Sequence, residues 1–350
     1  MKKGTRNICF LLFLFLILTI LLAGCKANTS PKDPAPEEGI GEEKDNPADQ
    51  EPQPETPGEL SPYTGFPVAE IFNRPYAIII ENLPPTRPQS GLSGAGIVYE
   101  FPVEGWITRF LALYISPYED DIGPVRSARP YIAYLTKEYD GILAHCGYSI
   151  HTEAVLKDIN AKHIDERYNS LYYKRLKSRN MPHNLYTTLS RLAPGAEKFN
   201  YLKGSQPTPV FSFGERKPPE QVVSTISIAF SPQNHVEYHW NSRETYTRYN
   251  DGSLFIDANS GEAVEVKNII IQFIKARAFT SEGHLEITLL GEGKGLLFSG
   301  GQVEEIKWQK NSYGEKTRFL DTNGRNILLQ PGNTWIHLVP QNGRVEWSLT

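Results

Sequence analysis

Cysteine and methionine are scarce in this chain, and the scarcity of cysteine excludes a disulfide-rich class of protein. The 350 residues include three cysteines and two methionines. Cys9 and Cys25 lie near the N-terminus and Cys146 stands by itself, so the body of the chain has no disulfide framework. Cys146 follows the apolar residues Leu143 and Ala144, which favours a buried free thiol over a nucleophile.

Net charge and the common catalytic motifs are also lacking in most of the chain. Residues 63–350 contain 30 basic and 30 acidic side chains, whereas the whole chain has a net charge of −4. Because proteins that bind nucleic acid present a strongly basic face, we expect no nucleic-acid partner. The chain has no Gly-x-Ser-x-Gly elbow, no His-Glu-x-x-His helix and no Walker loop. We therefore expect neither a metal nor a cofactor.

A long apolar run is found at the N-terminus, in a setting typical of an exported lipoprotein. Three basic residues precede an apolar run over residues 8–22, which is short for a membrane span. The run ends in Leu22-Ala-Gly-Cys25, which resembles the bacterial lipobox, whose cysteine receives a lipid. We predict a signal peptide over residues 1–24, a palmitate-bearing anchor on Cys25 and a location on the outer face of the cell membrane. A signal anchor with a chance cysteine is the alternative.

Residues 25–62 contain eight prolines, many acidic residues and few large apolar side chains. A segment of this composition cannot bury enough surface to offset the entropy lost on ordering, so we predict a disordered, acidic, proline-rich tether. Its negative charge should keep it extended and hold the folded body away from an anionic surface.

The rest of the chain divides into two patterns, which together predict the α+β class. Residues 63–206 mix β-branched runs with helical segments, which indicates a mixed α/β domain. In residues 207–350, short alternating strands are separated by turns such as Asn250-Asp-Gly252 and Asn323-Gly324. This spacing predicts an all-β domain, a small barrel or a sandwich.

Two predicted strands of the first domain bring together charged side chains. Strands over residues 97–101 and 106–115, joined by a turn at Glu104-Gly105, would place Glu100 directly opposite Arg109. A half-buried arginine needs a carboxylate partner, so a structural ion pair between Glu100 and Arg109 is favoured over a catalytic Glu100.

An anion site is the second expectation for the first domain. Arg126, Ser127 and Arg129 precede a predicted helix that has Pro130 in its first turn and Ser127 as its cap. Free N–H groups and the helix dipole favour an anion at such an end and disfavour cations, so two arginines there indicate a negative group nearby, such as a bound anion. The alternative is that an internal carboxylate neutralises them. The candidate ligand-binding residues are Arg126, Ser127, Arg129, Arg109, Asn82 and Arg87.

The candidate catalytic residues have less support in the sequence than the candidate ligand-binding residues. Glu100 and Glu104 resemble a glycosidase pair, but in an extended strand they would lie roughly 13 Å apart, beyond the separation of about 5 to 9.5 Å that this chemistry uses. His145 follows a short predicted strand, where it could be a general base, although a hydrogen-bonded structural histidine is the commoner case. Ser149 then caps a predicted helix.

Residues 168–179 interleave three tyrosines with four lysines and arginines. Tyrosines beside cations suit a surface that binds a sugar or a polyanion, and a solvated basic helix face is the alternative.

A resemblance to a known family emerges from several of these motifs. They are Arg87-Pro-Gln-Ser-Gly-Leu92, Tyr99-Glu100, Thr108-Arg-Phe110, Gly123-Pro-Val-Arg-Ser-Ala-Arg129, His145, Thr317-Arg-Phe319 and Pro331-Gly-Asn-Thr-Trp335. Together they resemble the YerB-like lipoproteins of Gram-positive bacteria, a family with N- and C-terminal parts of unknown function. The resemblance implies a lipoprotein with two parts, and it implies no particular reaction. Cys146 stands where we would expect a small residue.

Two functions from different classes therefore stay open, and a purely structural scaffold is a third alternative. The first is a non-enzymatic lipoprotein that binds an anionic envelope component, such as peptidoglycan or teichoic acid, or an envelope partner protein. The second is a wall-acting hydrolase or transferase that uses Glu100, Glu104 or His145 for acid–base chemistry beside the arginines. An enzyme needs two titratable groups that converge on one cleft, whereas a binding protein can leave both glutamates in ion pairs.

Overall fold

A computed structural model describes residues 58–204, 207–231 and 234–350 of the chain. The predicted signal peptide, Cys25 and most of the predicted tether lie outside the described residues. The described residues form one compact unit. None of the described helices is long and apolar enough to cross a membrane.

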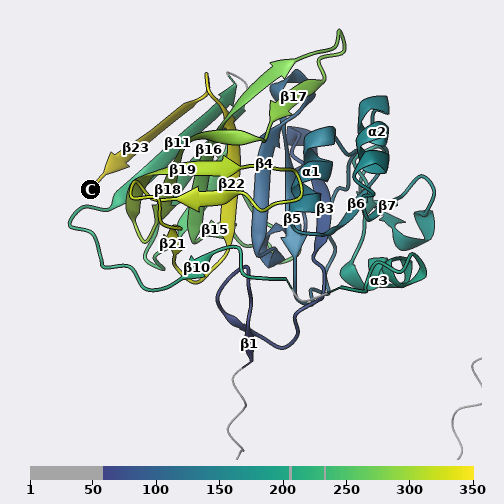
Figure 1. Cartoon of the computed structure of the whole chain (residues 1–350), viewed down its shortest axis with the longest axis horizontal. Coiled ribbons are helices and arrows are strands. Elements are labelled where there is room, and N and C mark those ends of the chain that lie inside the picture. The colour runs from purple at the N-terminus through teal and green to yellow at the C-terminus, as the bar shows by residue number, and fades with distance from the viewer. Residues whose placement is uncertain (1–57, 205–206, 232–233) are drawn as a thin grey trace, which may run out of the picture. The chain divides into compact units, whose positions relative to one another are not determined.

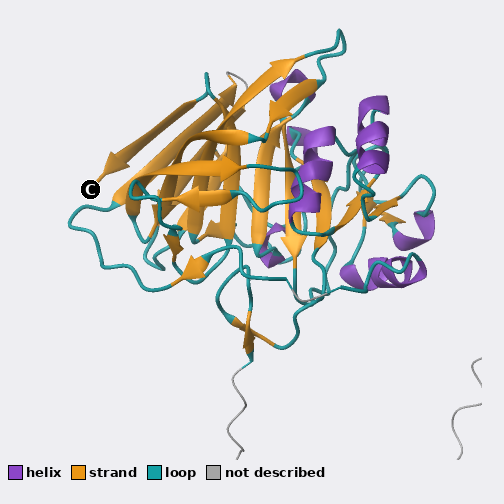
Figure 2. Ribbon diagram, viewed as in Figure 1, coloured by secondary structure: helices purple, strands orange, loops and turns teal. Residues whose placement is uncertain are grey.

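The main sheet has an open path of strands that runs through both halves of the chain (Figures 1 and 2). Its order is β20 (Arg318–Leu320), β19 (Gln302–Lys310), β18 (Gly291–Ser299), β16 (Asn268–Ala278), β22 (Thr334–Pro340), β4 (Ile97–Pro102), β5 (Thr108–Tyr114), β3 (Tyr76–Glu81), β6 (Ile142–His145) and β7 (His163–Asp165), with β17 (Leu285–Thr288) beside β16. The halves join where β22 pairs in parallel with β4, which sets His337 beside Glu100. The predicted domains therefore share one sheet.

A second sheet lies against one face of the main sheet. It contains β14 (Ser253–Leu254), β13 (Tyr246–Asn250), β12 (Asn234–Trp240), β11 (Val223–Ser231) and β23 (Arg344–Leu349), with β15 (Glu265–Val266) beside β13. Ile226 and Tyr238 of this sheet share an apolar cluster with Val98, Phe110 and Trp335 of the main sheet. Both sheets run as open paths, so the barrel considered for this half is not confirmed. The described residues are mostly in β-strands, with three α-helices, and a mixed α+β class is compatible with this content.

Two helices, over residues 130–138 and 150–158, cover the other face of the main sheet, whereas Leu189, Leu192 and Ala196 of a third helix pack in the apolar cluster on the same face as the second sheet. The described α-helices are α1 (Pro130–Glu138), α2 (Ile150–Asp158) and α3 (Leu189–Lys198), and the 3₁₀ turns are η1 (Pro84–Thr86), η2 (Leu92–Gly94), η3 (Glu104–Trp106) and η4 (Ser170–Tyr172). Ile132 and Leu135 of α1 pack with Tyr99 and Leu111, whose side chains leave the sheet on the side opposite Val98. Two-stranded pairs complete the fold: β1 (Glu59–Leu60) with β2 (Pro67–Val68), β8 (Lys174–Arg175) with β9 (Leu185–Tyr186), and β10 (Ser212–Phe213) with β21 (Leu328–Leu329).

The predicted register of the hairpin between β4 and β5 is wrong by one residue. Glu100 lies opposite Phe110, and Arg109 lies opposite Phe101. The turn is longer than expected: the N–H of Val103 donates to the carbonyl of Ile107 at 2.7 Å, and Gly105 and Trp106 adopt left-handed φ angles of 68° and 59°. Because side chains alternate between faces, this shift places Glu100 and Arg109 on opposite faces of the sheet, so they do not pair.

Candidate functional site

The carboxyl ends of β4, β3, β6 and β7 lie at the same edge of the main sheet, since these strands run in the same direction. Ligands of open α/β sheets commonly bind outside the carboxyl ends of strands. At this edge five charged side chains gather, and we call them the edge cluster. They are Glu81, Glu104, Arg109, Arg126 and Arg129.

Glu104 and Arg129 form the outer ion pair of the edge cluster. The Nη2 of Arg129 donates to Oε2 of Glu104 at 2.8 Å, and Nε contacts the other carboxylate oxygen. The attraction of Arg129 outweighs burial and lowers the pKa of Glu104, so the carboxylate is charged. Arg129 is the residue that precedes α1. The predicted Ser127 cap is wrong, because the Ser127 hydroxyl donates to the carbonyl of Cys146 at 2.8 Å instead.

Glu81 and Arg126 form the inner ion pair. Nε of Arg126 lies 3.1 Å from Oε1 of Glu81, and Nδ1 of His183 lies 2.8 Å from Oε2. Glu81 is buried, whereas the Arg126 side chain is 23% exposed. The guanidinium of Arg126 is therefore the part of this pair that a ligand can reach.

Arg109 has few protein partners for a buried arginine. Its Nη1 donates to the carbonyl of Ser127 at 3.0 Å, and its Nη2 lies 3.8 Å from Oε2 of Glu104. Its Nε is buried and has no hydrogen-bond partner among the described residues. Burial, together with the charges of Arg129 and Arg126 and against that of Glu104, lowers the pKa of Arg109 to about 10. The edge cluster holds three arginines against two carboxylates, so it has an excess positive charge.

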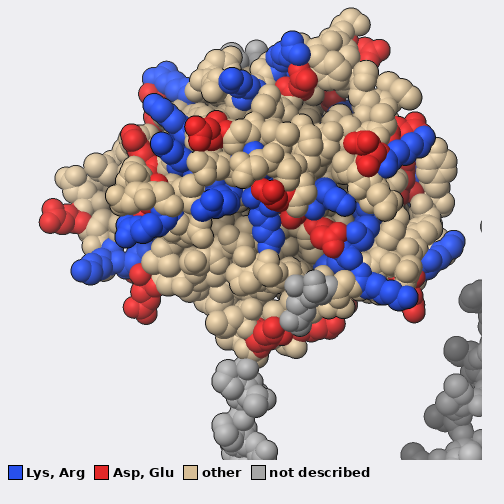
Figure 3. Space-filling model, viewed as in Figure 1, with Lys and Arg blue, Asp and Glu red and all other residues tan. Residues whose placement is uncertain are grey.

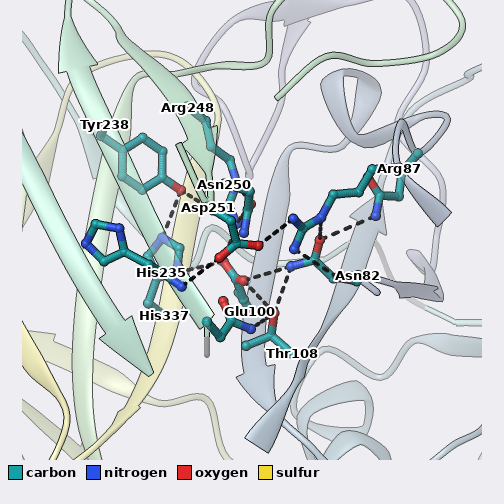
Figure 4. A network of polar contacts seen from close by, with 12 residues as sticks. Asn82, Arg87, Glu100, Thr108, His235, Tyr238, Arg248, Asn250, Asp251 and His337 are labelled. Carbon is teal, nitrogen blue, oxygen red and sulfur yellow. Dashed lines mark hydrogen bonds and ion pairs between the residues drawn. The ribbon is translucent and has the colours of Figure 1, made fainter. Parts of the chain in front are cut away.

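Glu100 belongs to a different group of residues in the interior of the protein (Figure 4). Its Oε2 lies 2.8 Å from Nη2 of Arg248 and 3.2 Å from Nδ1 of His337. Its Oε1 accepts hydrogen bonds from Thr108 at 2.8 Å and from Asn82 at 3.2 Å. Burial alone would raise the pKa of Glu100, but the charge of Arg248 and the bonds from His337 and Thr108 lower it to about 2. We call these five residues the buried network.

The buried network ties the two sheets together. Arg248 lies on β13, where its Nη1 donates to the hydroxyl of Tyr238 at 2.7 Å, and that hydroxyl lies 3.0 Å from Nε2 of His337. Arg87 extends the network outward: its Nε donates to Oδ1 of Asn82 at 3.1 Å, and its Nη1 pairs with Asp251 at 2.6 Å (Figure 4). Asn82 and Arg87 thus have protein partners, and their predicted role in ligand binding stays a prediction.

His145 and Cys146 lie beside the edge cluster and have protein partners of their own. Nδ1 of His145 donates to the carbonyl of Gly147 at 3.0 Å, so its Nε2 accepts from Nδ1 of His163 at 3.0 Å. Burial is the main cause that lowers the pKa of His145 to about 4. The thiol of Cys146 donates to Glu166 at 3.2 Å, and burial together with Glu166 raises its pKa to about 11. Cys146 is a free thiol, as predicted, but it is half-buried rather than buried.

Sequence reasoning missed three important partners: Glu81 of Arg126, and Arg248 and His337 of Glu100. A signal for Arg248 was present, since it occupies an inward position between Tyr246 and Asn250 of an alternating strand.

In the ranges that the structure describes, no three His, Cys, Asp or Glu side chains are placed to hold a metal ion.

Comparisons with known proteins agree with the order of the two parts. The family model described as "Protein of unknown function (DUF3048) N-terminal domain" matches residues 63–202, and the model for the C-terminal domain of the same family matches residues 226–336. A curated relative, "Putative lipoprotein YerB" of Bacillus subtilis (strain 168), is 34% identical over 297 residues, which cover 82% of this chain and 88% of the relative. A crystal structure of the YerB protein from Bacillus subtilis is similar with a TM-score of 0.74 and 32% identity, over 82% of this chain and 99% of that one.

Proposed function

The chain belongs to the DUF3048 family, and on that premise we propose that it is an envelope lipoprotein whose edge cluster binds an anionic component of the cell envelope. The lipid anchor would be on Cys25, and the folded part would lie at the outer face of the membrane of a Gram-positive bacterium. The Leu22-Ala-Gly-Cys25 motif and the name of the Bacillus relative support the anchor.

The observation that carries the anion site is the buried, unpartnered Nε of Arg109 in a cluster with excess positive charge. A buried donor without a partner costs about 1–3 kcal/mol, and more when the group is charged. An anion beside Arg109 and Arg126 would supply the missing acceptor and the missing negative charge together. Guanidinium groups match carboxylates and phosphates through paired hydrogen bonds.

The charge at this edge is local rather than spread over the surface. On the face drawn in Figure 3, basic and acidic side chains are interspersed. Such a surface does not attract a polyanion along its whole length. Specific contacts at the edge cluster are therefore the proposed source of affinity, and a phosphate or carboxylate group of the wall polymers is the proposed ligand.

Binding is favoured over catalysis because the candidate acids and bases are committed elsewhere. A general acid needs a carboxyl group whose pKa is raised toward the working pH. The pKa of Glu100 is about 2 and that of Glu104 is also lowered, so neither holds a proton at neutral pH. His145 is buried and both of its ring nitrogens have protein partners. These observations support a binding protein over a hydrolase or transferase.

The test is calorimetric titration of the full-length protein in detergent with inorganic phosphate, poly(glycerol phosphate) and muropeptides. Arg126→Gln should lower the affinity for phosphate by roughly tenfold or more, since a hydrogen bond to a charged group contributes about 1.5–3 kcal/mol. Arg126→Lys should keep part of the affinity because it keeps the charge. Arg344→Gln on β23 is the matched control, because Arg344 is an exposed arginine in an ion pair with Glu346.

The proposal fails if wild-type protein binds none of the three ligands at millimolar concentration. It also fails if Arg126→Gln, folded by circular dichroism, binds phosphate as tightly as Arg344→Gln does.

A further inference from the structure

Aromatic side chains lie near the edge cluster, in the turns that follow β6 and β7. The guanidinium carbon of Arg167 lies 4.1 Å from the ring centre of Tyr148 and 5.4 Å from that of Tyr168. Asp165 holds Arg167 with hydrogen bonds of 3.1 and 2.8 Å to Nε and Nη2. Tyr168 is 75% exposed. We call Tyr148, Arg167 and Tyr168 the aromatic platform; its central cation is fixed, and one of its rings is open to solvent.

Gly147 connects the aromatic platform to the edge cluster. A Cβ atom at Gly147 would lie 3.5 Å from Nε of Arg167 and 3.6 Å from the hydroxyl oxygen of Ser127. The carbonyl of Ser127 in turn accepts the hydrogen bond from Arg109. Gly147 has a φ of 77°, a conformation that side chains other than glycine rarely adopt. Because residue 147 is glycine, no side chain covers the main chain at this point between the aromatic platform and the edge cluster.

Three of the four basic side chains in residues 168–179 already have protein partners. Lys174 lies 2.6 Å from Asp121, and Arg175 lies 3.0 Å from Glu166. Arg179 donates to the carbonyls of Thr86 and Pro88, each at 2.6 Å. A long polyphosphate would find few free cations along this segment. A ligand with one anionic group and an apolar ring face fits the arrangement better.

From this juxtaposition we infer that the ligand is an acidic glycan: a sugar ring packs on the aromatic platform while an anionic substituent reaches the edge cluster. The inference rests on the proposed function and deepens it by naming the class of ligand. The flat face of a tyrosine contributes apolar contact, and its hydroxyl keeps hydrogen-bonding capacity. The exposed edge of the guanidinium of Arg167 and the hydroxyl of Ser127 are placed to meet sugar hydroxyls.

The experiment compares three probes on the full-length protein in detergent: the N-acetylglucosamine–N-acetylmuramic acid disaccharide, its neutral counterpart chitobiose, and inorganic phosphate. Wild-type protein should bind the acidic disaccharide more tightly than chitobiose. Tyr168→Ala should lower the affinity for the acidic disaccharide about three- to tenfold, as expected for loss of an aromatic contact, and leave phosphate binding unchanged. Leu171→Ala is the matched control, since Leu171 is 80% exposed in the same segment.

The outcomes separate this inference from the proposed function. Phosphate binding that depends on Arg126, together with disaccharide binding that ignores Tyr168→Ala, would overturn the glycan inference and leave the anion site standing. Absence of both phosphate and disaccharide binding would overturn both. Binding to vesicles of phosphatidylglycerol that Tyr168→Ala and Leu171→Ala weaken equally would also overturn the glycan inference, because the exposed side chains would then contact a membrane surface.

Discussion

Glu100 and Glu104 stand four positions apart, at the end of β4 and in the turn that follows it, yet their surroundings are opposite in kind. Glu100 has no exposed surface, and its partners Arg248 and His337 come from the second half of the chain. The Glu104 side chain is 21% exposed and pairs with Arg129 from the first half. A charge in the interior cannot exchange its partner for a ligand, whereas a charge at an edge can. Burial thus separates a structural carboxylate from one beside a binding site.

The largest expected effect comes from breaking the interior pair. Arg248→Met should lower the free energy of unfolding by roughly 3–5 kcal/mol, because it leaves Glu100 charged, buried and without its main partner. Arg129→Met should cost less, since water reaches Glu104. Urea unfolding of both variants measures the difference. If Arg248→Met does not fold, the double variant Arg248→Met/Glu100→Gln should recover folding. Equal losses in the two single variants would contradict the comparison.

Acid should unfold the protein through the same network. Burial lowers the pKa of His337 from its ordinary value of 6.5, and Arg248 lowers that of Glu100 from 4.5 to about 2. A group whose pKa is lower in the folded state stabilises the fold above its ordinary pKa and loses that contribution as pH falls. Stability should therefore decline below pH 6.5, with a further loss of up to about 3 kcal/mol from Glu100 between pH 4.5 and 2.

Urea unfolding at a series of pH values gives this profile. In Glu100→Gln the loss between pH 4.5 and 2 should be smaller than in wild type, although the variant is less stable at pH 7. A profile identical in shape to that of wild type would show that Glu100 does not cause the acid sensitivity.

Substitutions of Glu104 and Glu100 should differ in their effect on the affinity for phosphate, and this effect should be smaller. Glu104→Gln should raise the affinity for phosphate several-fold, because it removes a carboxylate that competes for Arg129 and Arg109. Its effect on the free energy of unfolding should stay near 1 kcal/mol, as for ion pairs that water reaches. Glu100→Gln should leave phosphate affinity unchanged. Calorimetry on the two variants measures the contrast, and a loss of affinity in Glu104→Gln would contradict it.

The smallest expected effect concerns a third glutamate, Glu166, whose exposure lies between that of Glu100 and that of Glu104. Burial and Glu166 raise the pKa of the Cys146 thiol to about 11, so little thiolate exists at pH 8. Iodoacetamide should modify Cys146 slowly, and Glu166→Gln should speed the reaction modestly by lowering the thiol pKa. Mass spectrometry follows the modification, with urea-unfolded protein as the fully reactive control. Rapid modification of the native protein at pH 8 would contradict the assigned environment.

Local patterns predicted much of the first half of the fold. The β-branched run after Tyr76 is strand β3, Pro130 begins α1, and the hydroxyl of Ser149 accepts the N–H of Thr152 at the start of α2. Each of these depends on neighbours a few positions away in the chain. The placement of polar residues at strand ends also held, because parallel strands bring their carboxyl ends to one edge.

Long-range pairing could not be predicted in the same way. Arg248 meets Glu100 only because β13 of the second sheet packs over β4, and no local signal specifies that contact. The register of β4 and β5 depended on one extra turn residue, since Trp106 adopts a left-handed conformation that its side chain does not favour. This shift of one position removed the predicted pairing of Glu100 with Arg109 and gave each side chain other partners.

The central claim is that the arginines at the sheet edge accept an anion while the interior arginine does not. Phosphate titration of isotopically labelled protein, followed through the Nε–H resonances of the arginine side chains, tests it most directly. The resonances of Arg109 and Arg126, assigned with Arg109→Lys and Arg126→Lys, should move and saturate together, and that of Arg248 should stay in place. A saturating shift at Arg248, or none at Arg109, would contradict the account.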